Sequence, residues 1–196
     1  MAQDLNCLCS DIPIRDGEGI EKVVNNITAN LKTCLGSLLN NYCSLALAEV
    51  REDIREDNTY TLPQYYTSNR EWLNLEPTTI VDAFSFFYKE GSKNNFSEDF
   101  SLYEQDVNLI FWINSEQIFN TTDYISTEDF ISSTLNALSN SRFDTIVSIN
   151  SVIDGYSDTW SDFDIVNDDT MKFNFKNYVT FKINLTLNVK ETICKC

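Results

Sequence analysis

The sequence predicts a single α+β domain, in which a mostly antiparallel sheet packs against two helices and carries a projecting β-hairpin. The clearest evidence is the stretch from Tyr178 to Lys190, where six apolar residues alternate without interruption with polar ones. This period of two is typical of a strand with one buried face. The length of 196 residues, with no internal repeat and no linker, suits one domain over residues 1–196.

The N-terminal half predicts one helix and the hairpin. After an extension at residues 1–16, apolar residues recur three and four positions apart from Ile20, which predicts an amphipathic helix to about Asn40. Asp57 and Asn58 suit the tip of a long hairpin over about 43–66, with strands at about 43–54 and 59–66. The charged residues near this tip have both signs. The tip is therefore either a solvated loop or a contact with a neighbouring subunit.

The C-terminal half predicts most of the remaining sheet. The stretch 102–114 is apolar on both faces, so it is a central strand or lies at a subunit contact. The polar face of the last strand, 178–190, is expected to meet water, a lumen or a neighbouring subunit. The other expected elements are a strand at 83–89, a loop at 91–99, a helix from Ser126 or Thr127 to about Ser141, a strand at 143–153 and an acidic, aromatic connection at 154–169.

The composition argues against several classes of function. The formal charge is −16, from 14 Lys and Arg against 30 Asp and Glu, and such a surface repels nucleic acid instead of reading it. The acidity serves solubility, or lines a channel through which DNA slides. The absence of His removes Ser-His-Asp and Cys-His nucleophiles and His-ligated zinc. We therefore expect neither an enzyme nor a cofactor.

The lack of a signal-peptide pattern and of a membrane-spanning run leads us to expect a protein that is cytosolic at synthesis. No apolar run approaches the roughly 18 to 20 residues that span a bilayer, and the first residues lack the pattern of a signal peptide. Free thiols are the first expectation in that compartment. The alternatives are disulfides formed after release, or a zinc site that joins the termini through Cys7, Cys9, Cys194 and Cys196.

The acidic connection is the one dense group of carboxylates. Oxygen-rich clusters suit hard cations, so Asp162 and Asp164 are candidate ligands for a small metal- or ligand-binding module. The ligand spacing of a calcium-binding EF-hand loop is missing, however. A solvated surface loop is the plainer interpretation, and catalysis by these carboxylates is the weakest one.

Several stretches, in order from about residue 60 to the C-terminus, resemble a known family. The chain resembles tail terminator or neck-ring proteins from phages and prophages of Bacteroidetes, including crAss-like phages. The CxC near each end and the long acidic hairpin depart from that pattern. The matching stretches are LPQYYTSNREWLNLEP, AFSFFYKEG, VNLIFWINSEQIF, the helix after Ile125, SVIDGYSDTWSDFDI and KNYVTFKINLTLNVKETIC.

The resemblance implies a structural virion protein, assembled in the host bacterial cytoplasm, that forms a six- or twelve-fold ring at the head–tail junction or in the tail. Its partners would be adjacent connector, portal or tail ring proteins, with DNA passing through the lumen without specific binding and no membrane contact. The many aromatic residues suit subunit interfaces. The residues expected at such contacts are Glu49, Arg51, Arg55, Trp112, Lys182 and Asn184.

Overall fold

The fold is one sheet with helices on both of its faces. A computed structural model describes residues 19–36, 42–55, 57–66, 72–75, 83–97, 101–114, 127–140, 146–164 and 178–191. The strands are β1 (Tyr42–Arg55), β2 (Asn58–Tyr66), β3 (Trp72–Asn74), β4 (Ala83–Asn94), β5 (Leu102–Asn114), β6 (Ile146–Asp154) and β7 (Tyr178–Lys190). The helices are α2 (Ile20–Leu35), α4 (Thr127–Asn140) and α5 (Tyr156–Thr159).

The strand pairing confirms the predicted α+β class. The strands follow the order β3-β2-β1-β4-β5-β7-β6. Within the described ranges, β1 and β4 run parallel and every other neighbouring pair is antiparallel. The hairpin, the strand at 102–114 and the last strand are all found where the sequence predicts them.

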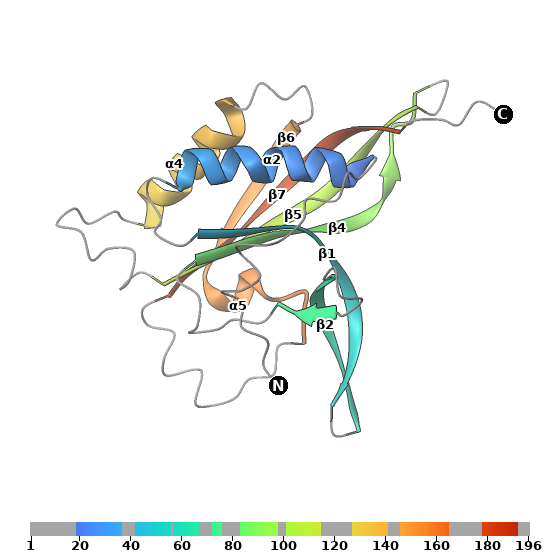
Figure 1. Ribbon diagram of the computed structural model, residues 1–196, viewed down its shortest axis with the longest axis vertical. Helices are drawn as coiled ribbons and strands as arrows, with labels where there is room; N and C mark the ends of the chain where they lie inside the picture. Colours follow the sequence, from blue (N-terminus) through green and yellow to red (C-terminus); the bar gives the residue numbers. More distant parts are fainter. Residues whose placement is uncertain are drawn as a thin grey trace.

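Helices α2 and α4 cover one face of the sheet (Figure 1). The periodic apolar residues of α2 are buried, as the spacing of three and four predicts. Against them, the rings of Phe111 and Phe181 stack with centroids 4.8 Å apart, and Phe130 of α4 meets both rings edge-on. No helix in the described ranges has the length and apolar character needed to cross a membrane.

A second apolar layer covers the opposite face. Trp112 of β5 and Phe86 of β4 pack there against Trp160 and Phe163, which follow α5. Because β5 is buried on both faces, it is a central strand of the sheet. Many aromatic residues therefore fill two core layers. The aromatic residues in these layers do not need subunit interfaces to explain their number.

The strand β1 takes part in two different pairings. Residues 42–48 run parallel to β4, whereas residues 49–55 pair antiparallel with β2. β1 therefore leaves the main sheet after Ala48, and it continues with β2 as a two-stranded arm. We define the arm as residues 49–55 and 58–63; it extends away from the helices and the main sheet in Figure 1.

Some expected boundaries are wrong. The helix from Ile20 ends at Leu35 and not near Asn40, with Gly36 as its cap, and residues 37–40 lie outside the described ranges. The first four residues of the loop expected at 91–99 belong to strand β4. The pairing of β4 with β5 is irregular after Glu90, where Gly91 has a φ of 64°, and it resumes at Asn94. The short strand β3 and the helix α5 were not predicted.

Candidate functional site

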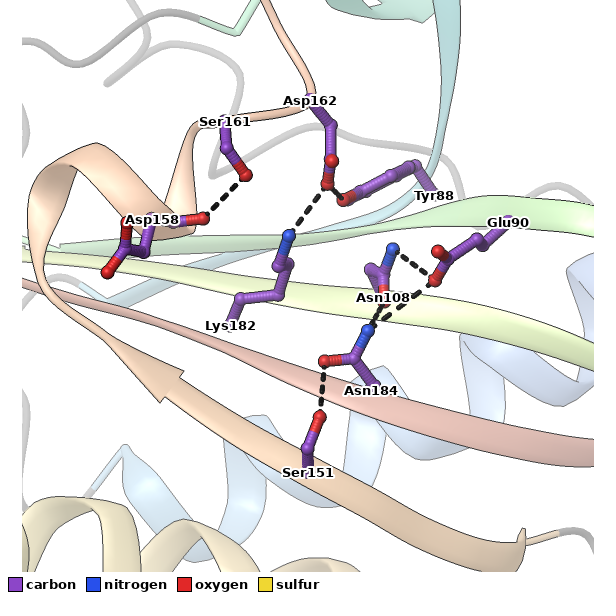
Figure 2. A network of polar contacts seen from close by, with 9 residues as sticks. All are labelled: Tyr88, Glu90, Asn108, Ser151, Asp158, Ser161, Asp162, Lys182 and Asn184. Atoms are coloured by element: carbon purple, nitrogen blue, oxygen red, sulfur yellow. Dashed lines mark hydrogen bonds and ion pairs between the residues drawn. The ribbon is translucent and has the colours of Figure 1, made fainter.

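A partly buried ion pair anchors the acidic segment onto the sheet (Figure 2). Lys182 of β7 donates to Oδ2 of Asp162 over 2.7 Å, and the Tyr88 hydroxyl of β4 donates to the same oxygen. The Lys182 side chain is only 6% exposed, whereas that of Asp162 is 44% exposed. Nearby, the Trp160 indole donates to the Thr180 hydroxyl over 3.2 Å. Two polar side chains of β7 are thereby satisfied beneath the segment.

The pKa shifts follow from this contact. Burial alone would raise the pKa of Asp162, but the hydrogen bonds from Lys182 and Tyr88 and the Lys182 charge outweigh burial, so the pKa is lowered. Burial raises the pKa of the Tyr88 hydroxyl, and the neighbouring Asp162 carboxylate raises it further. Tyr88 therefore stays a neutral donor at physiological pH, and Asp162 stays an anionic acceptor.

A polar network continues along the same face of the sheet, from β4 to β6 (Figure 2). Asn108 donates to Oε2 of Glu90 over 2.9 Å, and Asn184 donates to Oδ1 of Asn108 over 2.5 Å. Ser151 donates to Oδ1 of Asn184 over 2.8 Å. The network connects four neighbouring strands through amide, hydroxyl and carboxylate groups.

The segment after α5 also holds the base of the arm. The backbone N–H of Asp164 donates to the Thr61 carbonyl over 2.8 Å, and the Asp164 carboxylate accepts from the Thr61 N–H over 3.0 Å. This pair of contacts caps the outer edge of β2 like a short strand. Asp164 is thus a structural brace between the acidic segment and the arm.

The arm itself exposes apolar and charged side chains together. Ile54 is 75% exposed and Val50 is 43% exposed. The Arg51 guanidinium lies 4.2 Å from the centre of the Trp72 ring, and Asp53 accepts from Asn74 over 2.9 Å. Exposed branched apolar side chains on a projecting hairpin are typical of a surface that another chain covers.

A small pocket of about 240 Å³ opens where α5 meets β7. Its walls include Trp112, Tyr156 and Tyr178, with Asp154 also in the lining. The Trp112 ring is buried and stacks on Tyr178 with centroids 4.5 Å apart, while Tyr156 meets it edge-on. The pocket therefore lies beside aromatic side chains of the second core layer.

The structure distributes the six expected contact residues among three settings. Glu49 and Arg51 are exposed on the arm, and Arg55 pairs with Asn58 at its tip, with its side chain outside the description. Asn184 is half-buried in the polar network. Trp112 and Lys182 are buried in contacts within the chain, so they do not lie at a surface that a partner could reach.

The polar face of the last strand is correspondingly not a uniform open surface. Thr180 and Lys182 are buried under the acidic segment, while the polar residues farther along β7 are half-buried, up to the exposed Lys190. The described carboxylates of that segment are exposed, as the interpretation of a solvated surface expects, whereas Trp160 and Phe163 insert into the core. The spacing of three residues between Trp160 and Phe163 is the sequence feature that could have indicated their burial. No sequence feature indicated the roles of Tyr88 and Asn108, because their hydrogen-bond partners are distant in sequence.

The metal-site alternatives gain no support from the described residues. Asp162 and Asp164 are engaged by Lys182 and Thr61, and the described ranges contain no group of three or more acidic or Cys residues that could hold an ion. The four terminal cysteines, Cys7, Cys9, Cys194 and Cys196, lie outside the described ranges.

The two remaining cysteines differ in state. Cys34, on the exposed side of α2, is not disulfide-bonded, and its thiol donates to Oδ1 of Asn30 over 3.7 Å. Cys43, at the start of β1, is fully buried and disulfide-bonded. The expectation of free thiols is therefore wrong for Cys43.

The chain was also compared with known proteins. No protein-family model and no curated protein matches it. Its function must therefore be inferred from the arm, the sheet faces and the charge described above.

Proposed function

We propose that this chain is a non-enzymatic structural protein of a bacteriophage virion, which forms a ring at the head–tail junction or in the tail. In this role it joins neighbouring rings around the DNA channel. The family resemblance of the sequence supports the proposal. The charge of −16 also suits a channel that lets DNA slide without binding it.

The observation that carries the proposal is the arm. A two-stranded extension that leaves the main sheet and exposes Ile54 and Val50 offers a sheet edge and apolar side chains to another subunit. A ring requires such contacts to repeat and close. The buried Lys182 and Trp112 take no part in this proposal, and the contact residues retained are Glu49, Arg51 and Arg55, with Asn184 on the open part of the polar face.

The proposal is tested by the assembly of the full chain. Purified protein, alone and co-expressed with the products of the adjacent genes, is examined by light scattering and negative-stain electron microscopy. We expect closed rings of six or twelve copies, or incorporation into a particle with a portal or tail protein. A chain that forms no ring in either experiment would contradict the proposal. Genes for portal or capsid proteins beside this one would support the virion assignment separately.

A further inference from the structure

The outer edge of β1 in the arm has backbone groups that point away from β2. Thr61 and Pro63 direct backbone groups outward on the β2 side, since Asp164 and Leu75 bond to them there. In an antiparallel pair, residues opposite each other both point inward or both point outward. Their partners Glu52 and Val50 must therefore point outward at the β1 edge, and by alternation so must Ile54.

No described residue bonds to that edge. The pairing of β1 with β4 ends at Ala48, and the backbone hydrogen bonds between described residues include none to the outward groups of 50, 52 and 54. A row of unpaired N–H and C=O groups beside exposed apolar side chains is the usual template for adding a strand.

The sequence of this edge is complementary to itself. Residues 49–55 read EVREDIR. Antiparallel pairing of two copies about Glu52 places Glu49 opposite Arg55, Arg51 opposite Asp53 and Val50 opposite Ile54. Each of these pairs has opposite charges or two apolar side chains, and both kinds stabilise when directly opposite in a sheet.

The neighbouring registers do not have this property. Only pairings that put outward residues opposite each other can form hydrogen bonds, so the axis moves in steps of one residue. An axis at Arg51 pairs Glu49 with Asp53 and Arg51 with itself. An axis at Asp53 pairs Arg51 with Arg55 and Asp53 with itself. Both alternatives place like charges together, which leaves the Glu52 axis as the favoured register.

We propose that two copies of this chain associate through residues 49–55 of β1, paired antiparallel about a two-fold axis at Glu52. The contact joins the two arms into a four-stranded sheet, β2-β1-β1-β2. It forms about six interchain backbone hydrogen bonds, two for each outward pair. The inference does not depend on the proposed ring, because a two-fold contact of this kind does not close a ring by itself.

The contacts of the arm within its own chain are compatible with this pairing. Arg51 stacks on Trp72 and lies 3.5 Å from Glu49, yet its side chain remains 44% exposed and a guanidinium has five donors. The one unfavourable pair is Glu52 with its own copy at the axis. It should weaken the dimer at low salt, where charges are least screened.

The test measures the dimer dissociation constant of the full chain by sedimentation velocity. We expect the wild type to reach twice the chain mass of 22.6 kDa. Ile54→Lys, Arg51→Asp and Asp53→Arg should each weaken the dimer by about tenfold or more, since each change acts twice across the axis. The double variant Arg51→Asp with Asp53→Arg should return to within about threefold of the wild type, and Glu52→Gln should tighten the dimer.

Val152→Lys is the matched control, because Val152 is 37% exposed on the edge strand β6, away from the arm, and this change should leave the dissociation constant unchanged. Circular dichroism checks that every variant is folded. A wild type that stays monomeric at about 100 μM, or a double variant as weak as the two single ones, overturns the proposal.

Discussion

The Nζ atom of Lys182 lies 2.7 Å from Oδ2 of Asp162, and this contact joins the centre of the last strand to the segment that follows α5. The amine is almost fully buried and the carboxylate is half-exposed. A buried ammonium without a counter-charge is costly, so Asp162 holds Lys182 in place as much as Lys182 holds the segment. The acidic segment is therefore part of the fold.

Replacing Asp162 by Asn should destabilise the protein by about 1–2 kcal/mol. Breaking a fully buried pair costs roughly 3–5 kcal/mol, and solvent screening at the 44% exposed Asp162 side chain reduces that figure. Urea unfolding followed by Trp fluorescence measures the change. Asp158→Asn, an exposed change in the same segment, should stay within about 0.5 kcal/mol. Equal effects of the two substitutions would show that the ion pair contributes nothing specific.

The contribution of Asp162 should depend on pH in one direction. Its pKa in the folded protein is below the ordinary value of 3.8, so the stabilisation is complete above that value and is lost as the pH falls through the folded pKa. The difference in unfolding free energy between wild type and Asp162→Asn should be constant from pH 7 to about pH 5 and shrink below about pH 4. A difference that grows on acidification would contradict this sign.

The turn at the tip of the arm should respond to the backbone conformation of Asp57. Asp57 has a φ of 66°, a left-handed conformation that glycine and Asn tolerate and that β-branched residues avoid. Asp57→Gly should stabilise the protein by up to about 1 kcal/mol, and Asp57→Val should destabilise it by about 1–2 kcal/mol. Asp57→Asn serves as the control and should be nearly neutral. Thermal unfolding ranks the three variants. If Asp57→Val is as stable as Asp57→Gly, the left-handed conformation at this position does not affect stability.

The disulfide at Cys43 should make the stability sensitive to reduction. Native disulfides commonly contribute about 2–4 kcal/mol, so dithiothreitol should lower the urea midpoint of the wild type. Cys34→Ser should respond to dithiothreitol like the wild type, because Cys34 is exposed and is not disulfide-bonded. Cys43→Ser should start with the lower midpoint and change little on reduction. An unchanged wild-type midpoint would mean that the bond does not stabilise the fold.

The sequence alone determined the elements whose pattern is local. The alternation along Tyr178–Lys190 and the spacing of three and four along Ile20–Leu35 are set by the backbone geometry of strand and helix, which each segment carries by itself. The α+β class and the position of the hairpin follow from such patterns. The Gly91 irregularity and β3 escaped prediction, because only pairing with a neighbouring strand defines them.

Only the tertiary structure decided what covers each face. The polar face of β7 reads the same at Thr180, Lys182 and Asn184, yet the first two are buried by Trp160 and Asp162, while Asn184 joins an open network. Likewise, sequence could not show that β1 leaves the sheet after Ala48 and exposes the edge of the arm. The physical reason is that the burial of a residue on a sheet face depends on which distant segment packs over that face. The apolar area that is buried by each packing arrangement determines which arrangement forms.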